Sequence, residues 1–215
     1  MTTVTTIFLD IGGVLLSDGW DRHARRRAAK AFKLDTAEME ERHHMTFETF
    51  EEGKLTLDSY LDLVVFGERR SFTKAQFRRF MFSQSTSHPE MIALVARLRE
   101  RYGLKIIVVS NEARELNAYR IRRFELTGLV DAFISSCFVH LRKPDAEIFR
   151  VALDVAQTPA QQSVFIDDTP MFVEIAQRLG IRGIHHTGHL STAAQLEALG
   201  LKSAEGAASR RSTTR

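Results

Sequence analysis

From Leu104 onward, the sequence alternates between short apolar runs and longer stretches that have helical spacing. The strongest run, 104–110, reads Leu-Lys-Ile-Ile-Val-Val-Ser and is rich in β-branched residues, which favour strands. Further strands are expected near 131–135, at 163–167 and at 181–185. Strands that alternate with helices of this length form βαβ units, so the pattern predicts an α/β fold built on a parallel sheet.

The helices between these strands have recognisable ends. Pro89 suits the first turn of a helix, and Gly103 and Gly180 are well placed to end one. On this basis we expect helices over 89–101, 113–125, 144–156, 171–179 and 192–199.

The first 86 residues follow a different pattern. A first strand is expected at about 4–10, and residues 21–84 then show helical spacing without any strand-like run, with Thr73 as the expected N-cap of one helix. We therefore predict a Rossmann-like parallel sheet flanked by helices, with an all-helical cap inserted after the first strand. The predicted domain bounds are 1–16 and 87–201 for the α/β core, 17–86 for the helical cap, and 202–215 for a disordered tail.

Charge and composition exclude several classes of partner. The chain has 215 residues, 44% of them hydrophobic, and a formal net charge of +3. Residues 202–215 alone hold four cations and one anion, so the remainder is close to neutral and no nucleic-acid partner is expected. The single cysteine and the lack of a long apolar run or leader-like segment predict a cytoplasmic protein without a membrane partner. The oligomeric state is left open.

Polar residues follow the expected strands where each one ends. Asp10, Ser110 and the pair Asp167-Asp168 hold these positions, and Lys143 precedes a helix. Because the carboxyl ends of parallel strands meet at one edge of a sheet, these side chains are expected to converge. An aspartate can act as a nucleophile, a hydroxyl and an amine can hold phosphate oxygens, and carboxylates bind Mg²⁺. The set therefore predicts phosphoryl transfer from a small phosphorylated molecule.

The order of these residues resembles the haloacid dehalogenase-like hydrolase superfamily over nearly the whole chain. The helical insertion is similar to the small helical cap of that family. Within the superfamily, the chain is most similar to sugar-phosphate phosphatases of the glucose-1-phosphatase type. The four matching motifs are Phe-Leu-Asp10, Val-Val-Ser110-Asn111, Arg142-Lys143-Pro144 and Phe-Ile-Asp167-Asp168.

The resemblance implies roles for the acidic residues. Asp10 would attack phosphorus and form an aspartyl-phosphate intermediate. Asp10, Asp168 and the backbone carbonyl of Gly12 would hold Mg²⁺, and Asp167 would ligate the ion or orient its ligands.

The resemblance also implies how phosphate is held. Ser110, Asn111 and Lys143 would bind the transferring phosphoryl group, so that Ser110 and Lys143 act in catalysis together with the nucleophile. Cap residues would select the substrate.

Two positions depart from the family pattern. The family carries an aspartate two residues after the nucleophile as general acid and base, a role worth about 10²–10⁴-fold in rate, whereas this chain has Gly12. The change predicts a slow enzyme, a preference for good leaving groups, or another proton donor, for which Asp18 and His23 are candidates. The second departure is Phe172, where relatives carry an asparagine. Without this amide, the orientation of the acidic pair Asp167-Asp168 must depend on other residues.

Structural roles compete with several of these interpretations. Ser110-Asn111 is a possible N-cap for the helix over 113–125, and Asp167-Asp168 is a possible cap for 171–179. The histidines at 185, 186 and 189 straddle a strand end and lack the partners of a zinc site. Cys137 is interpreted as a buried thiol.

Two other functions fit the same residues. One is a non-catalytic phosphate-binding protein that has lost turnover at Gly12. The other is a 2-haloacid dehalogenase, which shares the aspartate nucleophile but needs no metal. Asp167 and Asp168 would repel the carboxylate of a haloacid unless a cation neutralised them.

Overall fold

A five-stranded parallel sheet forms the centre of the molecule, as the alternating pattern predicts. The computed structural model describes residues 3–203. The strand order is β3-β2-β1-β4-β5, and all four strand pairings are parallel. The strands are β1 (Thr6–Leu9), β2 (Lys105–Ser110), β3 (Ala132–Ser135), β4 (Ser163–Asp167) and β5 (Arg182–His185).

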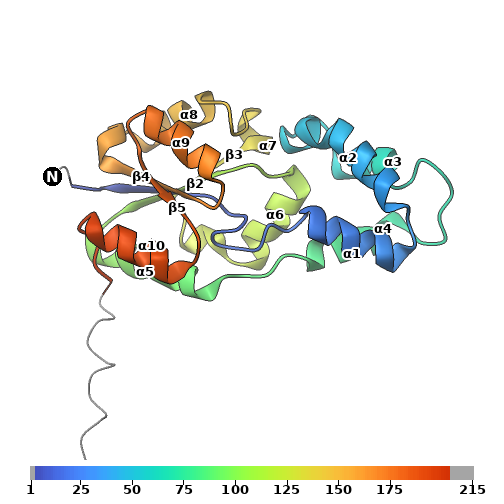
Figure 1. Ribbon diagram of the computed structural model, residues 1–215, viewed down its shortest axis with the longest axis horizontal. Helices are drawn as coiled ribbons and strands as arrows, with labels where there is room; N and C mark the ends of the chain where they lie inside the picture. The colour runs from blue at the N-terminus through green and yellow to red at the C-terminus, as the bar shows by residue number, and fades with distance from the viewer. Residues whose placement is uncertain (1–2, 204–215) are drawn as a thin grey trace, which may run out of the picture.

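Helices cover both faces of this sheet (Figure 1). Alternate residues of β1 point to opposite faces, so Ile7 and Leu9 join one apolar cluster and Phe8 joins the other. The first cluster includes residues of α5 (Pro89–Tyr102) and α10 (His189–Ala198), and the second includes residues of α8 (Glu147–Ala156) and α9 (Pro170–Arg178). The sheet is therefore buried on both sides, and only its edges are left for a site.

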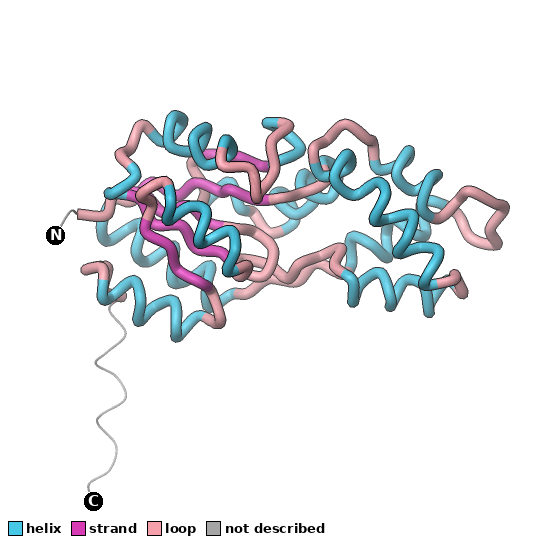
Figure 2. The backbone as a smooth tube through the Cα atoms, turned by 45° about the horizontal axis from the view of Figure 1, so that its top comes forward, coloured by secondary structure: helices cyan, strands magenta, loops and turns pink. Residues whose placement is uncertain are grey.

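Four helices lie to one side of the sheet (Figure 2), beyond the carboxyl ends of its strands (Figure 1). They share a separate apolar cluster, which includes Trp20, Tyr60 and Phe77 and extends to Ala113 and Leu116 of the α/β part. These helices are α1 (Arg22–Phe32), α2 (Thr36–Glu51), α3 (Leu57–Val64) and α4 (Lys74–Ser83).

The chain passes between the sheet and these four helices twice, and the two passages are hydrogen-bonded to each other. Ser17 N donates to Thr86 O at 2.9 Å, and Thr86 N donates to Ser17 Oγ at 3.0 Å. The residues that enter and leave the helical segment therefore lie side by side at its base.

Most predicted elements are confirmed, including the N-cap Thr73, and several boundaries move; Asp35 also caps a helix. Helix α8 begins at Glu147 rather than Pro144, because residues 143–146 form a turn that includes a cis Lys143–Pro144 peptide bond. Helix α10 begins three residues before the predicted start. The short helix α7 (Ser136–Val139) has no counterpart in the prediction.

Neither of the two strand-end caps considered from the sequence is formed. Helix α9 has Thr169 at its N-cap and no side-chain cap, so Asp167 and Asp168 do not cap it. Helix α6 (Arg114–Arg123) has Ala113 at its N-cap and no side-chain cap, because the Asn111 amide binds the backbone of Lys143 instead. Within residues 3–203, no helix combines the length and the apolar character needed to cross a membrane. Of the predicted tail 202–215, residues 204–215 lie outside the described residues.

Candidate active site

Asp10 lies at the carboxyl end of the central strand, and its carboxylate faces a buried lysine. Asp10 N donates to Ile166 O at 3.0 Å, which places Asp10 beside the end of β4. Lys143 Nζ lies 3.2 Å from Asp10 Oδ1 and 2.5 Å from Asp167 Oδ2, and the lysine side chain is only 1% exposed. Burial alone would lower the pKa of Lys143, but Asp10 and Asp167 raise it. The ammonium is therefore charged and holds two carboxylates together.

Asn111 fixes the loop that carries this lysine. Its Nδ2 donates to Lys143 O, and its Oδ1 accepts a hydrogen bond from Lys143 N, both at 2.8 Å. The two bonds pin the backbone of Lys143 to the end of β2. Asn111 therefore positions the lysine, in addition to lining the cavity described below.

The loop after Asp10 is tight enough to require glycine at one position. Gly13 has φ +68°, and a Cβ there would lie 2.2 Å from Asp168 Oδ2. Ile11 N donates to Asp10 Oδ1 at 2.9 Å and lies 3.4 Å from Ser110 Oγ. The loop thus brings Asp10 and Asp168 together, and Gly13 makes the close approach possible.

Three carboxylates meet where this loop faces the end of β4. Asp10, Asp167 and Asp168 each offer an oxygen, and these oxygens lie within 4.8 Å of one another. Burial raises the pKa of Asp168, and Asp10 and Asp18 add to the effect. Burial and Asp10 likewise raise the pKa of Asp167, opposed by Lys143. Carboxylates that repel one another and offer only oxygen ligands fit a hard divalent cation such as Mg²⁺.

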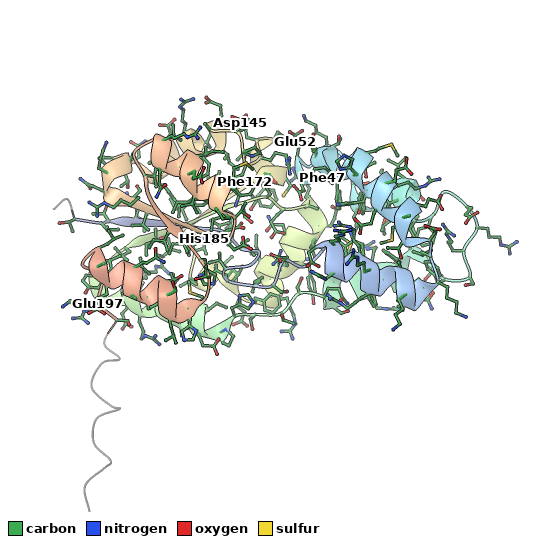
Figure 3. The ribbon with its side chains drawn as sticks, in the orientation of Figure 1. Phe47, Glu52, Asp145, Phe172, His185 and Glu197 are labelled. Atoms are coloured by element: carbon green, nitrogen blue, oxygen red, sulfur yellow. The ribbon has the colours of Figure 1, made fainter. Side chains whose placement is uncertain are left out.

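A cavity of about 370 Å³ opens above this group, between the sheet edge and the four helices. The sheet side contributes Asp10, Gly12, Asn111 and Asp168 to its lining. The helical segment contributes aromatic residues, among them Trp20, Phe47 and Phe50. Figure 3 labels Phe47 on α2, where that helix faces the α/β part.

The predicted site residues occupy two levels of this structure. Asp10, Asn111 and Asp168 line the cavity. Ser110, Lys143 and Asp167 lie beneath them and are at most 1% exposed. Gly12 also lines the cavity, so all seven predicted site residues converge at one sheet edge.

The cations that line the cavity are already paired. Arg25 Nη2 lies 2.8 Å from Glu40 Oε2, and its Nη1 donates to Trp20 O at 2.8 Å. The buried Arg120 is ion-paired with Glu112 and donates to the backbone carbonyl of Ser17. Sequence reasoning did not single out Arg120 or Glu112. Arg120 follows no strand end, and the arginine-rich helix that carries it predicts a solvated surface.

Of the two candidate proton donors, the structure brings only one to the cavity. Asp18 lines it, whereas His23 is exposed on α1 and is not among the lining residues. Desolvation raises the pKa of Asp18, and the charges of Asp21 and Asp10 add to this.

Asp167, the first residue of the acidic pair Asp167-Asp168, is held in place although position 172 is a phenylalanine. The Lys143 ammonium lies 5.0 Å from the centre of the Phe172 ring, a cation–π distance. Asp167 Oδ1 accepts a hydrogen bond from Thr169 N at 2.8 Å, and Oδ2 is held by Lys143. Backbone and lysine therefore orient Asp167 in place of an amide at position 172; Figure 3 labels Phe172.

The histidines near β5 form no metal site. His185 is exposed, while His186 is buried with Nδ1 2.8 Å from Thr192 Oγ1. Among residues 3–203, the acidic trio is the one group spaced to hold a metal ion. Cys137 is a free, buried thiol, as predicted.

Comparisons with known proteins agree on one family. The family model for haloacid dehalogenase-like hydrolases matches residues 4–181. The sesquiterpene phosphatase astK of Aspergillus oryzae is 28% identical over 203 residues, which cover 92% of this chain and 97% of that protein.

Solved structures share the fold. A haloacid dehalogenase family enzyme of Bacteroides thetaiotaomicron, in complex with magnesium and inorganic phosphate, has a TM-score of 0.73 at 22% identity, covering 87% of this chain and 98% of its own. An L-2-haloacid dehalogenase has a TM-score of 0.62 at 18% identity, covering 85% of this chain and 86% of its own.

Proposed function

The chain belongs to the haloacid dehalogenase-like hydrolase family, and from this premise we propose that it is a magnesium-dependent phosphomonoester hydrolase acting through an aspartyl-phosphate. The observation that carries the proposal is the position of Asp10, which meets a buried lysine on one side, an acidic cluster on another, and a cavity in front. The proposed substrate is a small phosphorylated metabolite such as a sugar phosphate.

Asp10 is the proposed nucleophile. Ile11 N and Lys143 Nζ both engage Oδ1, so neither of these interactions occupies Oδ2. Attack of Oδ2 on phosphorus would form an acyl phosphate, which water then hydrolyses. The Lys143 charge behind Asp10 would stabilise negative charge on the transferring group.

The remaining site residues keep the roles that the family resemblance implies. Asp10, Asp168 and the Gly12 carbonyl would hold the cation, with Asp167 orienting it. When bound, magnesium would neutralise charge on the phosphoryl oxygens. Asn111 and Ser110 are proposed as further phosphoryl ligands, Asn111 from the cavity wall and Ser110 from the level beneath.

The four helices are proposed to act as a cap, with bounds 17–86, that selects the leaving group. A second substrate class is an apolar alcohol phosphate. The aromatic lining by Trp20, Phe47 and Phe50 favours it, as does the sesquiterpene phosphatase relative. A cytoplasmic location is proposed from the unpaired Cys137.

The direct test is hydrolysis of p-nitrophenyl phosphate with Mg²⁺ by the wild-type protein and by Asp10→Asn. We expect nitrophenol release by the wild type, loss of activity in the variant, and loss of activity with EDTA. Equal rates for the two proteins would exclude Asp10 as the nucleophile.

The same preparations separate the alternatives. A dehalogenase would release halide from a 2-haloacid in the presence of EDTA. A non-catalytic phosphate-binding protein would be stabilised against heat by phosphate and magnesium but would form no product with any phosphomonoester.

A further inference from the structure

Hydrolysis of a phosphomonoester requires a proton for the departing alcohol, and position 12 has no side chain to supply it. We propose that Asp18, from the passage between the sheet and α1, is the general acid and base of this enzyme. The inference rests on the proposed phosphatase function, and it names the residue that completes the reaction.

Asp18 lies beside the space that a side chain at position 12 would enter. Its Oδ1 lies 3.4 Å, and its Cα 3.5 Å, from the point that a Cβ on Gly12 would take. Asp18 and Asp10 line the same cavity. A carboxyl that approaches from the cap side thus stands where the reaction needs an acid.

The other carboxyls that line the cavity are engaged elsewhere. Glu112 is paired with Arg120, and Glu51 Oε2 lies 2.8 Å from Arg142 Nη2. Asp21 Oδ1 accepts a hydrogen bond from Ala24 N at 2.7 Å and caps α1.

Asp168 belongs to the proposed cation site. Of the other carboxyls that line the cavity within residues 3–203, Asp18 is the one without a side-chain hydrogen bond or ion pair, so no partner competes for its proton.

The backbone around Asp18 is fixed, which gives its side chain a defined position. Ser17 is bonded to Thr86 and accepts a hydrogen bond from the buried Arg120. Trp20 N donates to Asp18 O at 2.9 Å. The buried Arg120 therefore acts as a positioning residue for the segment that carries the acid.

The two steps balance with one proton shuttled by Asp18. In the first step, Asp10 Oδ2 bonds to phosphorus, the bond from phosphorus to the ester oxygen breaks, and that oxygen takes the proton of Asp18. In the second step, water attacks phosphorus and gives a proton to Asp18, and the bond from phosphorus to Asp10 breaks. Hydrogen phosphate leaves, and both aspartates return to their starting states.

The test compares aryl phosphates of nearly the same shape whose phenols differ in acidity. It measures kcat/KM for p-nitrophenyl, p-chlorophenyl and phenyl phosphate with the wild type and with Asp18→Asn. A good leaving group needs little proton donation, so Asp18→Asn should lower kcat/KM for p-nitrophenyl phosphate by less than about 10-fold. For phenyl phosphate it should lower kcat/KM by about 10²–10⁴-fold. A variant that keeps the wild-type dependence on the leaving group would overturn the proposal.

Asp21→Asn is the matched control, because it removes a neighbouring charge while asparagine can still cap α1. It should leave the ratio of the phenyl to the p-nitrophenyl rates unchanged. If Asp21→Asn changes this ratio as much as Asp18→Asn does, the effect is electrostatic and the assignment to Asp18 is wrong.

A second variant keeps the proposal testable if Asp18→Asn is slow for another reason. Gly12→Asp in the Asp18→Asn background places a carboxyl beside the same space, where the nearest contacts of its Cβ are ordinary ones. It should restore at least 10-fold in the rate with phenyl phosphate, and a lack of rescue in a folded protein would count against Asp18. A wild type that hydrolyses no aryl phosphate would instead refute the proposed function itself.

Discussion

Lys143 is buried against two carboxylates at once, with its Nζ 3.2 Å from Asp10 Oδ1 and 2.5 Å from Asp167 Oδ2. This contact joins the ends of the two strands that carry the acidic cluster. A buried charge of this kind needs its partners, because removing one partner leaves the others desolvated and unpaired.

Lys143→Met should therefore damage both stability and activity. Loss of the ammonium leaves Asp10 and Asp167 facing each other, and we expect a loss of about 3–5 kcal/mol in the free energy of unfolding without magnesium. Magnesium should recover part of this loss, because the ion would supply positive charge to the same carboxylates. Urea unfolding with and without Mg²⁺ measures both effects.

Lys105→Met is the control for this prediction, since Lys105 lies at the opposite end of β2 and is exposed. It should change the free energy of unfolding by less than about 1 kcal/mol, with no added response to magnesium. A Lys143→Met protein as stable as this control would show that the buried contact contributes nothing to stability.

Gly12 and Gly13 are neighbours with opposite tolerance for a side chain. A Cβ on Gly13 would meet Asp168 Oδ2 at 2.2 Å in a left-handed backbone conformation, whereas a Cβ on Gly12 would meet Asp18 at 3.4 Å. Gly13→Ala should therefore destabilise the protein by more than about 1 kcal/mol and weaken magnesium binding. Gly12→Ala should keep both properties close to wild type.

Calorimetric titration with MgCl₂ and thermal unfolding of the two variants test this contrast. Equal magnesium affinity in Gly13→Ala and Gly12→Ala would mean that Asp168 does not need its present position to bind the ion.

The sheet and the convergence at its edge could be predicted because they depend on local patterns. Strand-like runs ended at Asp10, Ser110 and Asp167, and parallel strands bring such ends together. The cap of α6 was predicted wrongly because Asn111 has a more distant partner, the backbone of Lys143, that no local pattern reveals. Sequence alone could not locate α7, which is only four residues long.

The cavity wall was harder to predict because it depends on contacts between distant segments. Asp18 and His23 were equal candidates by sequence, and only the path of the chain after Ser17 places Asp18 in the cavity. Arg120 reaches back to Ser17 across 103 positions, a contact that no spacing rule predicts.

His43 should make stability depend on pH through its burial in the helical segment. Desolvation, with the nearby Arg25, lowers the pKa of His43 from 6.5 to about 4. The unfolded chain then binds a proton more readily than the folded one, so stability is present above the unfolded pKa and falls as the pH drops from 6.5 toward 4. Between pH 7 and pH 5 the loss should reach at most about 2 kcal/mol.

Urea unfolding of the wild type and His43→Gln at several pH values isolates this contribution. The variant should lose less stability than the wild type on acidification. At pH 8 the two proteins should differ in their free energy of unfolding only through the replaced contact with Tyr60. In the wild type, Tyr60 Oη lies 2.8 Å from His43 Nδ1. Parallel stability curves for the two proteins from pH 8 to pH 4 would assign the pH dependence to other groups.

The charge of the cavity predicts which leaving groups it accepts. Its two arginines, Arg25 and Arg120, are paired with Glu40 and Glu112, so neither is free for a second anionic group on the substrate. Asp21, which caps α1, adds a carboxylate to the wall that the helical segment contributes.

We therefore expect p-carbamoylphenyl phosphate, whose leaving group is neutral, to be hydrolysed at least about 10-fold faster than p-carboxyphenyl phosphate, an effect of about 1.4 kcal/mol. Because the repulsion is electrostatic, the gap in kcat/KM should narrow as the salt concentration rises. Equal rates for the two esters at low salt would indicate that a cation in the cavity leaves its partner to receive the carboxylate, and Arg120→Met would then identify whether it is Arg120.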